Sequence, residues 1–485
     1  MSRSRASLAL AAAVLLVIFS LLGRTAADGD LWGHLTFGRD ILAAHHVHTH
    51  DPYSFTSDRP WINHEWLAEA LMATAWTLGG VRALVALKLA LAALAVGFVL
   101  AAWQSWRLAP AWRDGLLFLV ALGVWPLMAT VRPQAFSVAL FAALLYALLR
   151  VRAGSRGWAV AVPVLMAAWV NVHGGWIVGA GAIAAFAAAS LVDPAFTPRR
   201  RFVVLAMAAA AATATLVNPY GPAMLAFLAD TVRPGRADVL EWQPVTALPA
   251  AILALWIVPA ALAVAGVWRD PRTRTPWALL VVAGLALGSL RVVRLLGFFA
   301  IASGMLAAPG AAGDARRRAD APVTVPPGYG LAALAAWVLA LVLVGGRISM
   351  DAPWPPEPGA ARFVAAHHLH GRLFTWFDYG EYAIWHFAPS LTVSMDGRRE
   401  TVYSDAVREA HQRIYRNAPD AIERLSAIAP DYVWLPVTAP VLPRLADAGW
   451  RTMYRGPRSV ILGHDESPTL VDETPVAQGR SFPGP

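Results

Sequence analysis

The chain has 485 residues, of which 57% are hydrophobic and only 15% are charged. Soluble domains carry about a quarter of charged residues, so this composition excludes an ordinary soluble protein and indicates a polytopic membrane protein. The net charge of +9 does not indicate nucleic acid, because the arginines lie in short clusters between apolar runs. The chain contains no cysteine, which excludes disulfides, thiolate metal sites and a cysteine nucleophile.

Apolar segments that could cross a bilayer as helices recur about eleven times along the chain. They lie roughly at 6–23, 84–103, 115–131, 134–150, 158–172, 174–192, 202–217, 249–267, 277–290, 292–309 and 328–345. We expect the first segment to be a retained helix, since its apolar core is long for a cleaved signal peptide.

The orientation of these spans follows from arginine, which cytoplasmic loops carry in excess. Arginine clusters occupy alternate connections: Arg3 and Arg5, Arg107 and Arg113, Arg150 to Arg156, Arg199 to Arg201, Arg269 to Arg274, and Arg316 to Arg318. The sequence therefore predicts a multi-pass plasma (inner) membrane protein with a cytoplasmic N-terminus. An odd number of spans places the C-terminal region outside the cytoplasm.

The first outward loop, 24–82, is the longest connection between spans and carries ionisable residues at both ends. Its candidate catalytic residues are Asp28, Asp30, His34, His64 and Glu65. Two short amphipathic helices are expected, one around Leu35 and Phe37 and one beginning at Trp66. His64 and Glu65 open the second helix, so both side chains could point back toward Asp28 and Asp30. An ordinary carboxylate at a helix N-terminus is the alternative for Glu65.

Between these helices lies a histidine-rich run, His45 to His50, followed by Asp51. Four imidazoles and a carboxylate so close together could ligate a metal, but their spacing matches no closed zinc pattern. A solvated loop is the other interpretation, since flexible histidine-rich loops are common.

The other outward connections hold polar residues in tight turns. They contain Arg132-Pro133, Asn171 with His173-Gly174-Gly175, Asn218 to Gly221, Glu241-Trp242, and Arg291 with Arg294. Any one of these turns could be simple turn chemistry at a helix end. Their gathering on one side of the predicted membrane topology instead indicates a specialised outer face.

The C-terminal region alternates strand-like pieces with helical stretches. Strands are predicted at 391–395 and 431–435, and helices at about 359–370, 404–426 and 440–448. We therefore predict an extracytoplasmic α/β domain over 346–464 after a transmembrane domain over 1–345. Residues 465–485 are expected to form a disordered tail.

Several of these motifs resemble those of the GT-C glycosyltransferase superfamily. The first loop, with Asp30-Leu31-Trp32-Gly33-His34 and Asp51-Pro52-Tyr53-Ser54, is similar to the first external loop of that superfamily. The whole series resembles bacterial multispan proteins of unassigned substrate within it. In addition, Thr375 to Gly380 is similar to the Trp-Trp-Asp-Tyr-Gly signature of oligosaccharyltransferase catalytic subunits, and Asp396-Gly397-Arg398 follows it.

The resemblance implies a cell-envelope enzyme that transfers a sugar from a polyprenyl-phosphate or polyprenyl-diphosphate donor on the non-cytoplasmic face. The acceptor would be a glycan, lipid or protein, with Trp376, Asp378, Tyr379 and Arg398 as the expected acceptor contacts. First-loop carboxylates would act as base or as ligands of a divalent metal ion. Metal dependence is in doubt, because the next outward loop, Thr130 to Pro133, lacks the second acidic pair of oligosaccharyltransferases.

Inverting sugar transfer needs a carboxylate base and cations that neutralise the departing lipid phosphate. Asp30 is the first choice of base and Asp28 the second. The expected phosphate-binding residues are Arg132, His173, Arg291 and Arg294, since guanidinium groups bind phosphate bidentately. The alternative is a protein that binds or transports polyprenyl lipid without transferase activity. A transporter would need polar groups at the bilayer midplane, and these are scarce here apart from Lys88.

Overall fold

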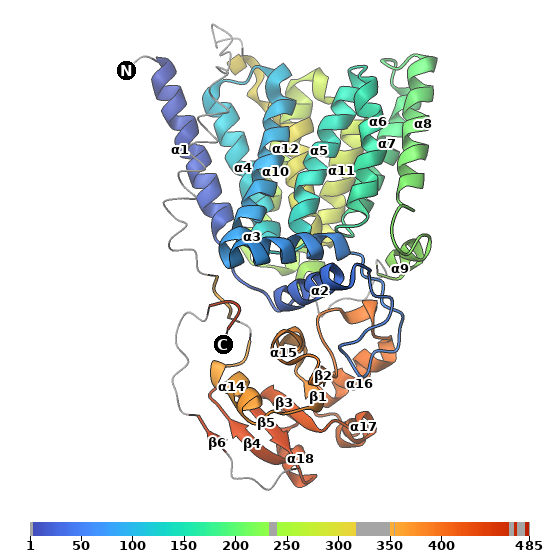
Figure 1. Ribbon diagram of the computed structural model, residues 1–485. Helices are drawn as coiled ribbons and strands as arrows, with labels where there is room; N and C mark the ends of the chain where they lie inside the picture. The colour runs from blue at the N-terminus through green and yellow to red at the C-terminus, as the bar shows by residue number, and fades with distance from the viewer. Residues whose placement is uncertain are drawn as a thin grey trace. The chain divides into compact units, whose positions relative to one another are not determined.

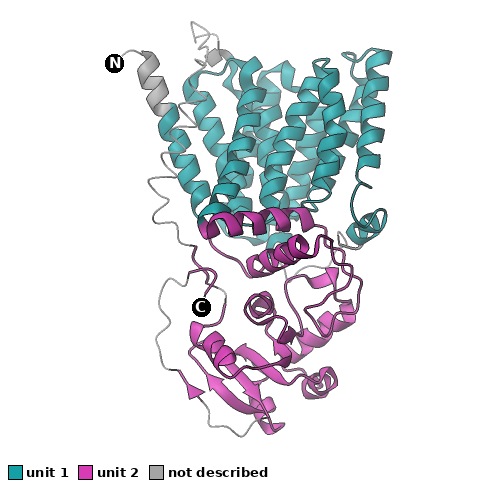
Figure 2. Ribbon diagram, in the orientation of Figure 1, with its two compact units in different colours: residues 1–25, 82–348 teal, residues 26–81, 349–485 magenta. Residues whose placement is uncertain are grey.

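The computed structural model describes residues 3–231, 240–316, 350–353, 355–464, 470–472 and 481–484. The chain forms two compact units (Figure 2). Unit 1 comprises Met1–Thr25 and Arg82–Ile348, and unit 2 comprises Ala26–Val81 and Ser349–Pro485. The units differ from the predicted domains in one respect, because most of the first loop, expected within 1–345, groups with the C-terminal region.

Unit 1 is built from apolar helices that pack side by side (Figure 1). Its helices are α1 (Arg3–Gly23), the later part of α3 (Trp66–Trp103), α4 (Pro110–Met128), α5 (Gln134–Arg152), α6 (Arg156–Trp169), α7 (Trp176–Val192), α8 (Pro198–Ala214), α9 (Ala223–Thr231), α10 (Ala250–Arg269), α11 (Pro276–Arg291) and α12 (Leu296–Leu306). Short 3₁₀ turns connect several of them, among them η2 (Leu240–Trp242) and η5 (Val293–Leu295).

Helix α3 is broken near its first third. Gly79 and Gly80 leave the helical conformation there, and Gly80 takes a φ of 57°, which favours glycine over residues with a side chain. The part before the break belongs to unit 2 and the apolar part after it to unit 1. The predicted amphipathic helix that begins at Trp66 is thereby confirmed as a segment distinct from the following span.

The described residues include four helical segments long and apolar enough to cross a membrane: Trp66–Trp106, Pro110–Met128, Gln134–Arg152 and Ala250–Arg269. Shorter apolar helices lie at Ala11–Gly23, Arg156–Trp169, Trp176–Val192, Pro276–Arg291 and Val293–Leu306. The predicted span at 328–345 lies outside the described residues. The structure thus shows a mainly helical unit that contains apolar helices of membrane-spanning length.

Lys88 is a buried polar residue of unit 1 that forms hydrogen bonds within the unit. Lys88 is 1% exposed and donates to the carbonyl oxygen of Met128 at 2.9 Å and to the hydroxyl of Thr25. A charge buried in a span requires such partners. Lys88 therefore connects the end of α1, α3 and the end of α4, which is a structural role.

Unit 2 centres on a mixed sheet in the order β2-β1-β3-β5-β4-β6. Its strands are β1 (Gly371–Thr375), β2 (Leu391–Val393), β3 (Tyr432–Pro436), β4 (Arg451–Arg455), β5 (Ser459–Gly463) and β6 (Leu470–Val471). Its helices are α2 (Leu31–Ala44), the first part of α3, α14 (Pro358–Ala366), α15 (Gly380–Phe387), α16 (Asp405–Tyr415), α17 (Ala421–Ile428) and α18 (Leu442–Asp447). The predicted C-terminal α/β region is confirmed, including the strands at 391–395 and 431–435.

The core of unit 2 lies between this sheet and its helices. β1 runs parallel to both β2 and β3, with Leu373 opposite Val393 and Tyr432. Phe374 and Val433 are fully buried and pack with Ile414 of α16 and Leu425 of α17. Alternating apolar residues on the strands supply this face, as the sequence pattern predicts.

Two short pieces of the predicted tail, residues 470–472 and 481–484, lie within the described residues and contact unit 2. β6 pairs in parallel with β4. Phe482 is 4% exposed, its ring centroid lies 4.8 Å from that of Trp32, and Trp32 donates to the carbonyl oxygen of Pro483 at 2.8 Å. Burial of the Phe482 ring stabilises the contact of this segment with unit 2, although the composition of the tail is mostly polar.

Candidate functional site

The first turn of α2 carries the leading candidate residues. Asp30 occupies the N-cap position, and the backbone N–H of His34 donates to its carbonyl oxygen at 3.0 Å. The carboxylate of Asp30 does not cap its own helix, although aspartate is among the preferred N-cap residues because it normally does. The N–H of Gly33 instead donates to Oε2 of Glu381 at 3.1 Å. Asp28 precedes this turn and is 8% exposed.

Glu381 lies in the first turn of α15, directly after the Trp376 to Gly380 motif, and is 3% exposed. A Cβ atom added at Gly397 would collide with carboxylate oxygens of both Asp30 and Glu381, so the two carboxyl groups meet beside this glycine. Burial, and then the charges of Asp30 and Asp396, raise the pKa of Glu381 well above its ordinary value. Glu381 consequently holds its proton more readily than an ordinary glutamic acid.

A second group surrounds His34, one turn further along α2. Nδ1 of His34 and Oε1 of Glu69 are 3.0 Å apart, and Asn63 donates to the other oxygen of Glu69 at 2.5 Å. Gly38 permits this contact, because a Cβ there would collide with the backbone of Glu69. Burial acts to lower the pKa of His34, but the hydrogen bond to Glu69 and the nearby carboxylates raise it to about 9.

Glu65 also belongs to this second group. One ligand atom from each of His34, Glu65 and Glu69 lies within 4.8 Å of the others, and Nε2 of His64 lies 3.5 Å from Oε1 of Glu65. The charge of Asp30 contributes to the raised pKa of His34. The predicted residues His34, His64 and Glu65 are therefore brought into one region with Asp30.

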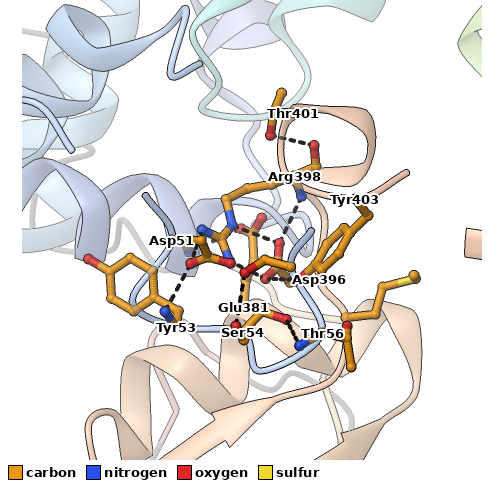
Figure 3. A network of polar contacts seen from close by, with 12 residues as sticks. Asp51, Tyr53, Ser54, Thr56, Glu381, Asp396, Arg398, Thr401 and Tyr403 are labelled. Carbon is orange, nitrogen blue, oxygen red and sulfur yellow. Dashed lines mark hydrogen bonds and ion pairs between the residues drawn. The ribbon is translucent and has the colours of Figure 1, made fainter. Parts of the chain in front are cut away.

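Arg398 lies at the centre of a buried ion-pair network (Figure 3). Its guanidinium donates to Asp51 at 2.6 Å and to Asp396 at 2.6 Å, and Tyr403 donates to Asp396 at 2.8 Å. The guanidinium carbon also lies 4.8 Å from the ring centroid of Trp61. Arg398 is 9% exposed and is held by both carboxylates, an arrangement typical of a structural ion pair. The expected acceptor contact of Arg398 stays a prediction.

The other expected acceptor residues divide between surface and core. Asp378 is exposed and accepts from Nε1 of Trp376 at 3.2 Å. Tyr379 is 5% exposed and packs against Trp434, with ring centroids 5.9 Å apart. Trp376 and Asp378 can therefore contact another molecule, whereas Tyr379 supports the motif from within.

The histidine-rich run is largely at the surface. His45, His46 and His50 are exposed. Among the residues that the structure describes, the metal-compatible group comprises His34, Glu65 and Glu69 and includes none of the run. The solvated-loop interpretation therefore fits the structure better than the metal interpretation.

Unit 1 gathers a separate cluster of cations around one carboxylate. NH1 of Arg132 donates to Oε1 of Glu241 at 3.1 Å, and Nε of Arg294 lies 3.7 Å from Oε2 of Glu241. The backbone N–H of Val293 donates to Gln243 at 3.1 Å, which joins η5 to the segment after η2 and brings Arg294 to Glu241. Two guanidinium groups thus hold the two oxygens of a single anion.

His173 extends this cluster into the interior. Its Nε2 lies 3.1 Å from NH2 of Arg294, and its Nδ1 lies 2.7 Å from the hydroxyl of Ser137. The backbone N–H of Gly175 also donates to Nδ1 at 3.0 Å. Nε1 of Trp169 donates to the same Ser137 hydroxyl at 2.7 Å, which fixes the ring from the far side.

Arg291 is not part of this cluster. It is exposed, at the last turn of α11, and among the described contacts it has none with Arg132, Glu241 or His173. Of the four predicted phosphate-binding residues, the structure therefore brings together Arg132, His173 and Arg294.

Sequence reasoning missed two residues of these groups. Glu381 lies 348 positions from Gly33, which it contacts. In the sequence, its position directly after the aromatic motif is the feature that could have indicated it. Glu69 lies within the predicted amphipathic helix, three positions after Trp66, and a buried glutamate on such a helix would have been the signal.

Comparison with known proteins identifies the fold. No family model matches the chain, and no curated protein matches it. The Archaeoglobus fulgidus oligosaccharyltransferase in its apo form aligns with a TM-score of 0.58 at 14% identity, covering 95% of this chain and 74% of its own. The same organism's AglB, in complex with an inhibitory peptide and a dolichol-phosphate, gives 0.55 at 11% identity, with 88% and 69% covered.

ArnT from Cupriavidus metallidurans in the apo state aligns with a TM-score of 0.53 at 14% identity, covering 95% of this chain and 98% of its own. Its structure bound to undecaprenyl phosphate gives 0.50 at the same identity and coverage. The oligosaccharyltransferase and ArnT are both GT-C glycosyltransferases. The chain has the GT-C fold. This GT-C assignment confirms the resemblance drawn from the first-loop and C-terminal motifs, at the level of the fold.

Proposed function

We propose that this chain is a membrane glycosyltransferase that moves a sugar from a polyprenyl-phosphate or polyprenyl-diphosphate donor to an acceptor outside the cytoplasm. The observation that carries the proposal is the pair of arginines that converge on one anion in a GT-C fold. Arg132 and Arg294 hold the two oxygens of Glu241, in the manner in which a guanidinium pair holds a phosphate. The neighbours AglB and ArnT are each known in complex with a polyprenyl-type phosphate.

The proposed reaction is a single displacement at the anomeric carbon of the donor sugar. An acceptor hydroxyl oxygen forms the new bond to this carbon, while the bond from the carbon to the phosphate oxygen breaks. The electron pair leaves with the polyprenyl phosphate or diphosphate. The proton of the acceptor hydroxyl passes to the carboxylate of Asp30, which acts as general base.

Asp30 is suited to this role by its surroundings. Its side chain does not cap α2, and burial raises the pKa of the neighbouring Glu381 well above its ordinary value. Acid and base roles separate where the surroundings of two neighbouring carboxyl groups differ in this way. Asp28 is the second candidate for the base.

In unit 1, we assign the leaving phosphate to Arg132 and Arg294, with His173 holding Arg294 in place. Glu241 occupies the anion position between the two arginines in the structure. A lipid phosphate would take the place of this carboxylate, so that the cations exchange one anion for another. Stabilising the charge that develops on the leaving group is commonly the largest contribution to catalysis of this kind.

A divalent metal ion, which GT-C relatives suggest, would be held by His34, Glu65 and Glu69. One imidazole nitrogen and two carboxylate oxygens within 4.8 Å of one another form a donor set that fits such an ion. When bound, the ion would supply positive charge in this part of unit 2. His34 carries a proton at pH 7 because its pKa is about 9, so this group is an ion pair until that proton is released.

The acceptor side of the proposal rests on Asp378, which is exposed, and on Trp376, which is partly exposed beside it. A tryptophan ring beside a carboxylate is suited to a sugar or a polar chain, since the ring stacks and the carboxylate accepts hydrogen bonds. We infer an acceptor glycan, lipid or protein in the bacterial cell envelope.

The test is a deletion strain of the organism that carries this protein. The proposal predicts accumulation of one polyprenyl-linked sugar, detected by mass spectrometry, and its disappearance on complementation with the wild-type chain. Complementation with Asp30→Asn should fail, whereas Asp447→Asn, at the end of α18, should succeed. A lipid pool unchanged by the deletion would contradict the transferase. Rescue by Asp30→Asn would favour a protein that binds or transports the lipid.

A further inference from the structure

We propose that unit 2 contains a peptide-recognition site whose ligand, in this structure, is the chain's own segment Ser481–Gly484. Four aromatic side chains surround that segment and form what we call the aromatic cage: Trp32, Trp76, Tyr382 and Trp385. The ligand that fits the cage is an aromatic residue followed by proline and glycine. This binding site is separate from the proposed sugar transfer and requires neither the assigned base nor the assigned phosphate site.

Phe482 supplies the side chain that the cage encloses. Its ring centroid lies 4.8 Å from that of Trp32, 5.3 Å from that of Trp76 and 6.3 Å from that of Trp385, and the residue is 4% exposed. The approach to Trp76 is edge-to-face, at an interplanar angle of 82°, a geometry that stabilises aromatic pairs beyond simple burial. Three indole rings around one phenyl ring therefore favour an aromatic side chain over an aliphatic one.

The walls of the cage also hold one another in place. Trp32 meets Tyr382 edge-to-face, with ring centroids 5.6 Å apart. Trp76 meets Trp385 in the same way at 5.8 Å, and the guanidinium carbon of Arg39 lies 4.0 Å from the ring centroid of Trp385, a cation–π contact. None of these contacts involves the segment 481–484, so the cage should keep its shape without a ligand. A preformed site lowers the cost of binding.

The backbone of the segment pairs with an existing strand edge. Ser481 forms an antiparallel bridge with Asp351, and the N–H of Phe482 donates to the carbonyl oxygen of Met350 at 2.8 Å. Asp351 also forms a parallel bridge with Ala26, so three distant parts of the chain lie edge to edge. Addition of an extended segment to such an edge, with a separate site for one side chain, is a recurring mode of peptide recognition.

Pro483 and Gly484 complete the recognised sequence. Nε1 of Trp32 donates to the carbonyl oxygen of Pro483 at 2.8 Å, and Nε2 of His386 lies 3.2 Å from the same oxygen. Because a carbonyl oxygen only accepts, Nε2 of His386 carries a proton. Gly484 takes a φ of 92°, which favours glycine, and a Cβ there would lie 3.4 Å from the ring of Tyr382.

The segment should be exchangeable with a peptide of the same sequence. One buried phenyl ring and the three hydrogen bonds to Met350, Trp32 and His386 favour docking. The ordering of four residues opposes it, and proline reduces that cost because its φ is already fixed. Favourable and unfavourable contributions of similar size give a docking equilibrium that a second peptide molecule can shift.

Occupation of the cage connects two helices of unit 2. Trp32 lies in the first turn of α2, and Tyr382 and Trp385 lie on α15. Phe482 contacts Trp32 and Trp385 together, so the segment bridges both helices. Docking should therefore slow the local opening of α2 and α15, which hydrogen exchange detects.

The experiment compares the full chain with a chain that ends at Arg480, both in nanodiscs. The probe is a fluorescently labelled peptide of residues 479–485, amidated at its C-terminus, and fluorescence polarisation measures its binding. The shortened chain should bind the peptide with a Kd of about 100 μM or less. The full chain should bind about tenfold more weakly, because an attached ligand competes at an effective concentration of about 1 mM. Absence of binding to the shortened chain, or equal binding to both chains, would overturn the proposal.

Two substitutions locate the binding site. A peptide with Phe482→Ala should bind the shortened chain at least about tenfold more weakly, and Trp385→Ala in the shortened chain should weaken binding of the unaltered peptide by a similar factor. Trp450→Ala is the matched control, since Trp450 is also a partly buried tryptophan of unit 2 but its ring packs on His464, with centroids 4.2 Å apart. It should leave the affinity within about twofold. Equal losses in Trp385→Ala and Trp450→Ala would overturn the cage as the site.

Phe482→Ala in the full chain decides the question if the shortened chain does not fold. Hydrogen exchange over residues 31–36 and 380–387 should accelerate in this variant, return toward the wild-type rate when the unaltered peptide is added, and stay fast with the Phe482→Ala peptide. Wild-type exchange in the Phe482→Ala chain, or failure of the unaltered peptide to slow it, would overturn the inference. None of these measurements uses a sugar donor, so their outcome is distinct from that of the transferase test.

Discussion

Nδ1 of His34 lies 3.0 Å from Oε1 of Glu69, and both side chains are buried inside unit 2. A histidine that is buried against a carboxylate stabilises the folded state by its charge only while it stays protonated. The pKa of His34, raised to about 9 from an ordinary 6.5, makes this pair a source of pH-dependent stability.

The first prediction concerns this pair. Its contribution should be fully present below about pH 6.5, where histidine is protonated in both states, and should be lost as the pH rises through about 9, with a total of about 3 kcal/mol. Thermal unfolding followed by tryptophan fluorescence should show the wild-type midpoint falling over this window. His34→Gln should abolish the slope, and His370→Gln, at an exposed position, should retain it. A wild-type midpoint that rises over the same window would contradict the assigned proton.

The second prediction separates the arginines of unit 1. Arg132→Lys and Arg294→Lys should each weaken binding of undecaprenyl phosphate by about tenfold, because lysine replaces a planar fork with a point charge. Arg291→Lys should stay within about twofold, since Arg291 stands apart from the cluster. Native mass spectrometry of nanodisc samples measures the affinity. Equal losses at all three positions would mean that the arginines act only through their charge.

The third prediction is a gain in affinity for undecaprenyl phosphate, where the second predicted losses. If Glu241 occupies the place of the lipid phosphate, then Glu241→Gln should raise the affinity for undecaprenyl phosphate by about fivefold, because removing a competing anion contributes about 1 kcal/mol. Asp193→Asn is the control, as Asp193 is also paired with an arginine, Arg152, at 3.0 Å. Weaker binding by Glu241→Gln would show that this carboxylate supports the arginines instead of competing for them.

Much of the local structure was accessible from sequence patterns. The helix around Leu35, the helix from Trp66 and the strand at 431–435 follow from periodicity over a few residues. The proximity of Asp30 to His34 follows from their spacing of four on one helix. These features depend on neighbours in the chain, which is why a single sequence suffices to predict them.

The remaining site contacts join distant parts of the chain. Glu381 and Gly33 are separated by 348 positions, and Arg132 and Glu241 by 109, so no local period brings them together. Arg398 follows a motif that resembles an acceptor site, but its burial between Asp51 and Asp396 depends on the first loop. Tertiary packing, which the sequence pattern does not contain, decides whether a charged residue faces solvent or a partner.

The fourth prediction tests the proposed topology. Because the chain has no cysteine, single-cysteine variants need no background substitutions. Ala195→Cys, beside the Arg199 to Arg201 cluster, should react with an impermeant maleimide only after the membrane is opened. Pro222→Cys and Gln412→Cys, both at exposed positions, should react in intact cells. Identical labelling of Ala195→Cys and Pro222→Cys would remove the basis for a specialised outer face.

The most direct test of the account is turnover by the purified chain. In nanodiscs with undecaprenyl-phosphate-linked monosaccharides and a cell-envelope extract as acceptor, the wild-type chain should release undecaprenyl phosphate and attach the sugar to an acceptor. Asp30→Asn should bind the donor with wild-type affinity and release at least about a hundredfold less product, as expected when a general base is lost. Release at the wild-type rate by Asp30→Asn would contradict the central claim that this carboxylate is the base of a sugar transfer.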